Sequence, residues 1–139
     1  MTVVVDASVL VAALLDAGDE GAWAEGVLLS STSLQAPELV RAEATNVLRR
    51  LERAKQISTA EANAAHEDLM QLKLELFGFD DFGERVWELR HAVTSYDAWY
   101  IALAEALDLP LATLDERLTK APGVNCEFVT PRSGKRKTP

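Results

Sequence analysis

The chain begins with a short run of β-branched residues, Thr2 to Val5, which carries no charged side chain until Asp6 ends it. A strand that lacks regular polar alternation is typical of a parallel strand buried in a sheet. Parallel neighbours need long crossover connections, which are usually helices. The opening run therefore predicts an α/β fold.

Helical and extended patterns alternate along the rest of the chain. Ser58 with Glu61 forms a capping box, and Thr94 with Asp97 forms an aspartate version of it, each at the start of a helix. Pro37 suits the first turn of the long helix. The predicted helices span residues 8–16, 21–30, 37–55, 59–72, 80–93, 94–107 and 115–119, and the predicted strands span residues 33–36, 74–79, 110–113 and 127–129. This alternation predicts one α/β domain around a mostly parallel sheet.

Charge is distributed unevenly along the 139 residues, whose net charge is −8. The last basic residues lie after Pro131, so residues 1–131 hold 10 basic and 22 acidic side chains, a net charge of −12. We assign residues 1–130 to one domain and residues 131–139 to a basic tail that we expect to be disordered. An acidic body argues against nucleic-acid binding. Carboxylates that hold a divalent cation would reverse this argument, because the cation inverts the local field.

Cysteine content and hydropathy indicate the compartment. Cys126 is the single cysteine and cannot form an internal disulfide, which favours a reducing compartment. No apolar run approaches the ~20 residues of a membrane helix. The apolar N-terminus lacks a basic region and contains Asp6, so we do not interpret it as a signal peptide. We expect a cytoplasmic protein that does not enter a membrane.

Four acidic residues lie where α/β folds bind ligands. Asp6 ends the first strand and Asp115 follows the strand 110–113, so we expect both at the carboxyl edge of the sheet. Asp97 lies in the first turn of a helix, and Glu43 lies beside the apolar stripe of the long helix. Carboxylates brought together repel one another unless a hard cation such as Mg²⁺ shares them.

Each acid alone also has an ordinary structural interpretation. Asp6 could end a strand, and Asp97 and Asp115 could cap helices. Glu43 could pair with Arg50, which lies on the same helix face.

Segments centred on these acids resemble the motifs of PIN-domain nucleases. The four segments are Val3-Val4-Val5-Asp6-Ala7-Ser8, then Pro37 to Leu48 with Glu43 three residues before Asn46, then Ser95-Tyr96-Asp97-Ala98 continued to Ala104, and Leu111-Ala112-Thr113-Leu114-Asp115 continued to Leu118. Their order and spacing agree with the family from residue 3 to about residue 129. Residues 58–93 match no motif.

The resemblance implies a three-layer α/β/α fold and an endoribonuclease that depends on Mg²⁺, for which Mn²⁺ can substitute. It implies that the catalytic and metal-binding acids are Asp6, Glu43, Asp97 and Asp115. Ser8 and Thr113 match positions whose hydroxyls support the site, and Asn46 matches a residue that hydrogen-bonds within the second motif.

The length of the chain and the form of its motifs resemble those of the VapC toxins of type II toxin–antitoxin pairs. This implies an RNA substrate and inhibition by a VapB-like antitoxin, and we also expect a homodimer. Arg49, Arg50 and Arg53 give the Glu43 helix a basic side, which is a candidate RNA-binding surface or simply a solvated helix face. Two alternatives stay open, namely a phosphotransfer domain that uses Asp6 and a non-catalytic binding module with the PIN fold. RNA target, cut sequence, number of metal ions and antitoxin identity do not follow from the sequence.

Overall fold

A parallel sheet forms the centre of the computed structural model, which describes residues 1–15 and 18–132. Within the described residues the sheet has five strands in the order β3-β2-β1-β4-β5. The strands are β1 (Thr2–Val5), β2 (Ser33–Pro37), β3 (Glu75–Phe77), β4 (Leu111–Ala112) and β5 (Phe128–Val129). Each neighbouring pair runs parallel. The first strand along the chain therefore lies at the centre.

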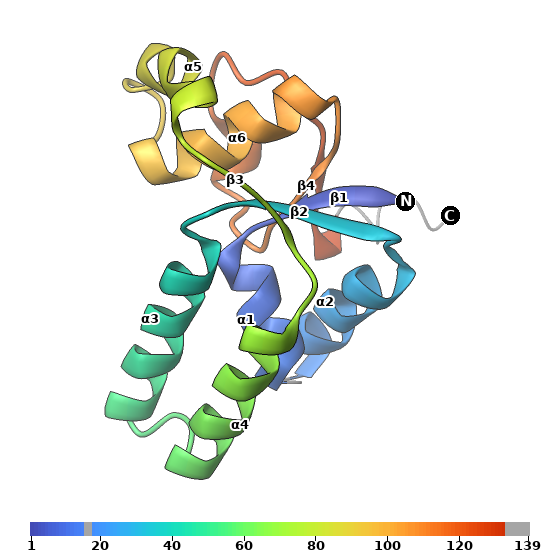
Figure 1. Cartoon of the computed structure of the whole chain (residues 1–139), viewed down its shortest axis with the longest axis vertical. Coiled ribbons are helices and arrows are strands. Elements are labelled where there is room, and N and C mark those ends of the chain that lie inside the picture. The colour runs from blue at the N-terminus through green and yellow to red at the C-terminus, as the bar shows by residue number, and fades with distance from the viewer. Residues whose placement is uncertain (16–17, 133–139) are drawn as a thin grey trace.

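Helices cover both faces of this sheet (Figure 1). The helices are α1 (Ala7–Leu15), α2 (Gly18–Ser30), α3 (Val40–Arg53), α4 (Thr59–Gln71), α5 (Gly83–Glu88) and α6 (Ser95–Leu107), with 3₁₀ turns η1 (Asp80–Phe82) and η2 (Leu118–Lys120). The first four helices lie on one face, and α5 and α6 lie on the other. The predicted three-layer α/β/α architecture is confirmed, and the sheet is wholly parallel within the described residues.

The sequence pattern explains why β1 and α6 form the core. Val3, Val4 and Val5 are fully buried, as expected for a strand with helices on both sides. Helix α6 is buried almost throughout its middle, where small residues such as Ala102 and Ala104 allow close approach to the sheet. Burial of this apolar surface is the main stabilising contribution to the fold.

Helix starts were predicted well where a capping side chain marks them. Ser58 N donates to Glu61 Oε1 at 2.9 Å and Glu61 N donates to Ser58 Oγ at 3.0 Å, so the capping box of α4 is confirmed. Asp97 N donates to Thr94 Oγ1 at 3.2 Å at the start of α6. These bonds satisfy backbone donors that a helix leaves free at its N-terminus.

Three predicted elements differ from the structure. Pro37 is the last residue of β2 rather than part of a helix, and the next residue, Glu38, continues the ladder by donating its N–H to Phe77. Residues 80–93 form η1, α5 and turns instead of one helix. Residues 115–117 are not helical, because the Asp115 side chain accepts the Arg117 N–H and forms a local turn.

Some expectations fall at the limits of the described chain. The predicted end of the first helix at Asp16 and the predicted tail from residue 133 onward lie outside the described residues. In the part that the structure describes, no helix has the length and apolar character needed to cross a membrane.

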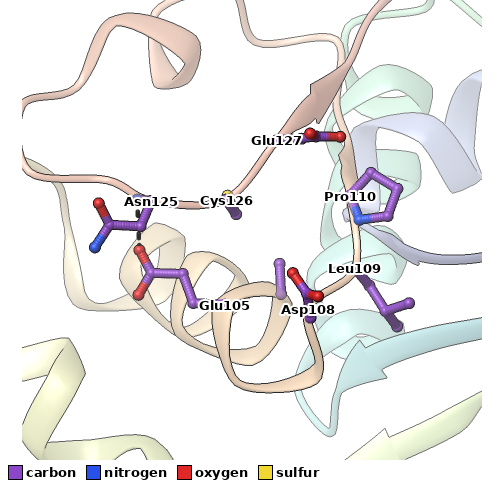
Figure 2. Close-up of a pocket in the computed structure, with 8 residues that line it drawn as sticks. Glu105, Asp108, Leu109, Pro110, Asn125, Cys126 and Glu127 are labelled. Atoms are coloured by element: carbon purple, nitrogen blue, oxygen red, sulfur yellow. Dashed lines mark hydrogen bonds between the residues drawn. The ribbon is translucent and has the colours of Figure 1, made fainter.

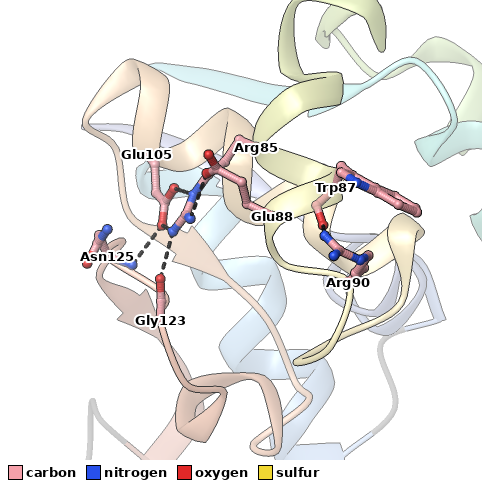
Figure 3. Close-up of polar contacts among 7 residues, drawn as sticks. All are labelled: Arg85, Trp87, Glu88, Arg90, Glu105, Gly123 and Asn125. Carbon is pink, nitrogen blue, oxygen red and sulfur yellow. Dashed lines mark hydrogen bonds and ion pairs between the residues drawn. The ribbon is translucent and has the colours of Figure 1, made fainter.

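Hydrogen bonds around Arg85 join α5 to α6 and to the segment before β5 (Figure 3). Arg85 donates from Nε to Glu105 Oε1 at 2.7 Å and from Nη2 to Glu105 Oε2 at 3.1 Å and to the Gly123 carbonyl at 2.6 Å. Asn125 N donates to the same carboxylate at 2.7 Å. Burial alone would raise the pKa of Glu105, but these hydrogen bonds outweigh it and lower the pKa.

We expect Glu105→Gln to lower the free energy of unfolding by about 1 kcal/mol at neutral pH, because the charge-assisted bonds to Arg85 become weaker. A carboxyl group whose pKa is lowered on folding contributes stability above its unfolded pKa and loses it as pH falls through the folded value. The difference from wild type should therefore narrow below about pH 4. Urea unfolding at pH 7 and at pH 3 measures this difference. Glu88→Gln is the control, because Glu88 contacts the same arginine from an exposed position.

Candidate active site

Asp6 is held at the carboxyl end of the central strand. Its Oδ1 accepts hydrogen bonds from Ser8 Oγ at 2.5 Å and from Val9 N at 3.2 Å. Its Oδ2 accepts a short hydrogen bond from Thr113 Oγ1. The side chain is partly buried, and burial raises its pKa although all of these bonds oppose the rise. The two hydroxyls predicted to support the site thus lie in direct contact with Asp6.

The same two hydroxyls also join the ends of β1 and β4. Ser8 Oγ accepts from Leu114 N at 3.2 Å, and Thr113 Oγ1 accepts from Asp115 N at 3.0 Å. Thr113 is fully buried. The first and fourth motifs are therefore one hydrogen-bonded unit, although more than a hundred residues separate them.

Glu43 lies in the first turn of α3 and is held from α6 by a tyrosine. The Tyr100 hydroxyl donates a short hydrogen bond to Glu43 Oε1. Tyr100 is only 3% exposed, so this hydroxyl lies away from solvent. Burial raises the pKa of Glu43, and the nearby charges of Asp97 and Asp6 raise it further against the effect of Tyr100.

Asp97 and Asp115 complete the acidic cluster from α6 and from the segment after β4. Burial raises the pKa of Asp97, and the charge of Asp115 acts in the same direction. Asp115 differs, because its hydrogen bonds from Arg117 lower its pKa. The charges of Asp6 and Asp97 therefore act on Glu43, and the charge of Asp115 acts on Asp97, so these interactions connect all four acids.

The acidic cluster fits a divalent cation by its chemistry. Its possible ligand atoms are oxygens. Burial raises the pKa of Asp6, Glu43 and Asp97, and neighbouring acids raise the pKa of Glu43 and Asp97 further, so a bound cation would relieve an unfavourable negative charge. Among the described residues, no three acidic, histidine or cysteine side chains are close enough to enclose an ion. Mg²⁺ usually takes one or two direct carboxylates and keeps several waters, so it does not require three protein ligands around the ion.

The predicted RNA-binding residues lie further along α3. Asn46 is exposed and accepts a hydrogen bond from Arg49 Nη1 at 3.3 Å, and Arg49 lies just beyond the second motif, which ends at Leu48. Arg50 and Arg53 are also exposed, and in the described part of the chain no ion pair joins Arg50 to Glu43. The structure therefore does not support the alternative in which Arg50 holds Glu43.

Two residues in contact with the acids were not predicted as site residues. Tyr100 follows Asp97 by three positions and so shares its helix face. Arg117 donates from Nε to Asp115 Oδ1 and from Nη2 to Asp115 Oδ2, both at 3.2 Å. The sequence places Arg117 two residues after Asp115, but spacing in an irregular segment does not show which way a side chain points.

A separate cavity of about 390 Å³ lies at the other end of α6 (Figure 2). Its lining includes Glu105, Asp108, Cys126 and Glu127, and none of the acidic cluster. Burial raises the pKa of the Cys126 thiol to about 11, so this cysteine is not a reactive thiolate at neutral pH. The cavity does not belong to the acidic cluster.

Comparisons with known proteins agree with the motifs and the fold. A family model described as "PIN domain" matches residues 3–124. Ribonuclease VapC1 of Mycobacterium tuberculosis is 44% identical over 126 residues, which cover 90% of this chain and 94% of that protein.

Solved structures show the same fold. PAE2754 from Pyrobaculum aerophilum matches with a TM-score of 0.68 and 24% identity over 98% of this chain and 88% of that one. A structure of VapBC2 from Rickettsia felis, bound to a DNA fragment from its promoter, matches with a TM-score of 0.61 and 16% identity over 93% of this chain and 99% of that one.

We expect Asp6→Asn to leave the metal-free protein as stable as wild type or more stable at neutral pH. A carboxyl group whose pKa is raised on folding costs stability once pH exceeds its unfolded pKa, and asparagine avoids that cost. The advantage of the variant should therefore appear above about pH 4 and grow toward pH 7. Thermal unfolding in EDTA at several pH values measures it, with the exposed Asp68→Asn as control. A variant markedly less stable than wild type at pH 7 would show that Asp6 mainly serves as a structural acceptor.

Proposed function

The chain belongs to the PIN domain family, in its VapC group, and on that premise we propose that it is the toxin of a type II toxin–antitoxin pair and an Mg²⁺-dependent endoribonuclease. One observation carries the proposal. Asp6, Glu43, Asp97 and Asp115 come from distant segments, and they lie near enough to act electrostatically on one another at the carboxyl end of a parallel sheet. A relative that is 44% identical over nearly its whole length is a ribonuclease by name, which supports RNA as the substrate.

Mg²⁺, for which Mn²⁺ can substitute, is the proposed cofactor, and carboxylates of the acidic cluster would hold it. When bound, such a cation supplies Lewis acidity toward a phosphodiester and activates water for hydrolysis. The protein contributes orientation. Ser8 and Thr113 fix the two oxygens of Asp6, and Tyr100 fixes one oxygen of Glu43. Side chains fixed before substrate arrives need no reorganisation during the reaction.

The alternatives are supported less well. A phosphotransfer domain is suggested only by the aspartate that follows the first strand, whereas the relative that is 44% identical is a ribonuclease by name. A non-catalytic module would not require the raised pKa values of several clustered acids. Titration with Mn²⁺ separates this module from the enzyme, because a binding module need not bind a divalent cation.

The proposed partners are RNA, a VapB-like antitoxin and a second copy of the chain. The solved VapBC2 complex supports an antitoxin partner for a protein of this fold. Leu29 is 78% exposed and borders an apolar groove together with Leu28 and Leu72. Leu48 on α3, by contrast, is only 3% exposed and packs in the core. The helix α2 side is therefore the better candidate for a protein interface.

Purified protein should cleave single-stranded RNA with Mg²⁺ or Mn²⁺ and lose cleavage in EDTA. Asp97→Asn should lower the rate at least about 100-fold, because even residues that only orient metal ligands contribute 10- to 100-fold. Asp108→Asn is the matched control. Asp108 lies at the other end of the same helix with φ of 54°, a left-handed conformation that asparagine also tolerates. Undiminished cleavage in EDTA, or by Asp97→Asn, would contradict the proposal.

We also expect the isolated chain to form a dimer at micromolar concentration. Sedimentation equilibrium should give twice the chain mass of 15.2 kDa. Leu29→Asp, at the apolar groove proposed as a protein interface, should shift the sedimentation mass toward that of the monomer, because it places a charge on the exposed apolar surface. A wild-type protein that sediments as a monomer would contradict the predicted homodimer.

A further inference from the structure

Arg117 is a cation that lies directly against the acidic cluster. Its guanidinium donates to both oxygens of Asp115, and its backbone N–H donates to Asp115 Oδ1 at 3.0 Å. Asp97 lies within electrostatic range of the same guanidinium. The backbone bond holds the residue beside Asp115 even when the side chain moves.

The other arginines near the sheet are engaged elsewhere. Arg41 donates to the carbonyls of Leu69 and Leu72 at the end of α4, at 3.1 and 2.9 Å. Arg85 is bound by Glu105, and Arg90 lies over the ring of Trp87 at 4.3 Å (Figure 3).

The basic side of α3 is not adjacent to the acids either. Of Arg49, Arg50 and Arg53, Arg49 is nearest to Glu43 along the chain. It follows Glu43 by six residues and so lies roughly 9 Å further along the helix axis. Among the described residues, Arg117 is therefore the one cation that hydrogen-bonds an acid of the cluster.

The geometry leaves Arg117 available to a ligand. Its side chain is 91% exposed, and in the described part of the chain its Nη1 makes no hydrogen bond. An exposed ion pair of this kind is weak, with a median of about 0–1 kcal/mol, so a competing anion can draw the guanidinium away from Asp115. The guanidinium fork matches a phosphate in two parallel hydrogen bonds.

We propose that Arg117 binds a backbone phosphate of the RNA beside the acidic cluster, an inference that rests on the proposed ribonuclease function. RNA must approach a body whose residues 1–131 carry a net charge of −12. A cation at the edge of the acids lowers the repulsion at the place where a phosphodiester must lie. Asp115 then has a second role, because it holds this arginine at the site until RNA arrives.

The test measures RNA binding rather than cleavage. Full-length protein is titrated into labelled single-stranded RNA, and fluorescence anisotropy is recorded at several salt concentrations. Ca²⁺ replaces Mg²⁺ to slow cleavage, because it also takes oxygen ligands but with looser geometry. Arg117→Ala should weaken binding about tenfold. It should also flatten the slope of log affinity against log salt by about 0.7, the effect of one lost phosphate contact on a single strand.

Two further variants control for charge and for side-chain shape. Lys120 is exposed, lies three residues after Arg117 and carries the same charge. Lys120→Ala should change the salt slope far less than Arg117→Ala. Arg117→Lys should keep most of the salt slope but lose part of the affinity, because lysine is a point charge without the fork. The loss of RNA affinity in Arg117→Ala should be equal for RNAs of different sequence, since phosphate contacts carry no sequence information.

Arg117→Ala with the affinity and slope of Lys120→Ala would overturn the proposal. If wild type cleaves RNA while Arg117→Ala shows this result, only the inference about Arg117 fails. If wild type binds RNA but does not cleave it with Mg²⁺, the ribonuclease proposal fails, and the salt slope still decides the role of Arg117. A wild type that binds no RNA would overturn both.

Discussion

The hydrogen bond between Thr113 and Asp6 joins the ends of two neighbouring parallel strands, and much of the structure depends on it. At the carboxyl edge of a parallel sheet, the last residues of all the strands lie together. The buried backbone groups at this edge need hydrogen-bond partners. Thr113 is fully buried and both donates to Asp6 and accepts from the Asp115 backbone. Ser8 does the same between Asp6 and Leu114. Two small hydroxyls thus position the carboxylate and the loop that carries the next acid.

These hydrogen bonds do not remove the electrostatic cost of the site. Burial raises the pKa of Asp6, Glu43 and Asp97, which means that the fold opposes ionisation of these groups. Asp115 differs because it faces Arg117 and solvent, and its pKa is lowered. The site therefore has an inner part where charge is unfavourable and an outer part where it is already balanced. A cation is most favourable in the inner part, and an anionic substrate is most favourable near the outer arginine.

The fold class could be predicted because it depends on strong local signals, whereas the four acids were assigned by the resemblance of their motifs to those of PIN-domain nucleases. The run before Asp6 and the capping side chains Ser58 and Thr94 each determine local structure within a few residues. Pro37 was placed wrongly because the same residue suits a helix start and the end of a strand whose next N–H continues the ladder. Tyr100 and Arg117 could not be assigned to the site, since their roles depend on contacts across elements and on the direction of one exposed side chain.

The acidic site is assembled from both ends of the chain, and this has a consequence for synthesis. Asp6 leaves the ribosome more than a hundred residues before its partner Thr113 and the neighbouring Asp115. Strand β4, which carries Thr113 into position, pairs with β1 at the centre of the sheet. A chain that has not yet reached Thr113 therefore contains Asp6 without its hydrogen bond from Thr113, and it lacks Asp115. An activity that needs all four acids can therefore arise only after the chain has been translated past Asp115.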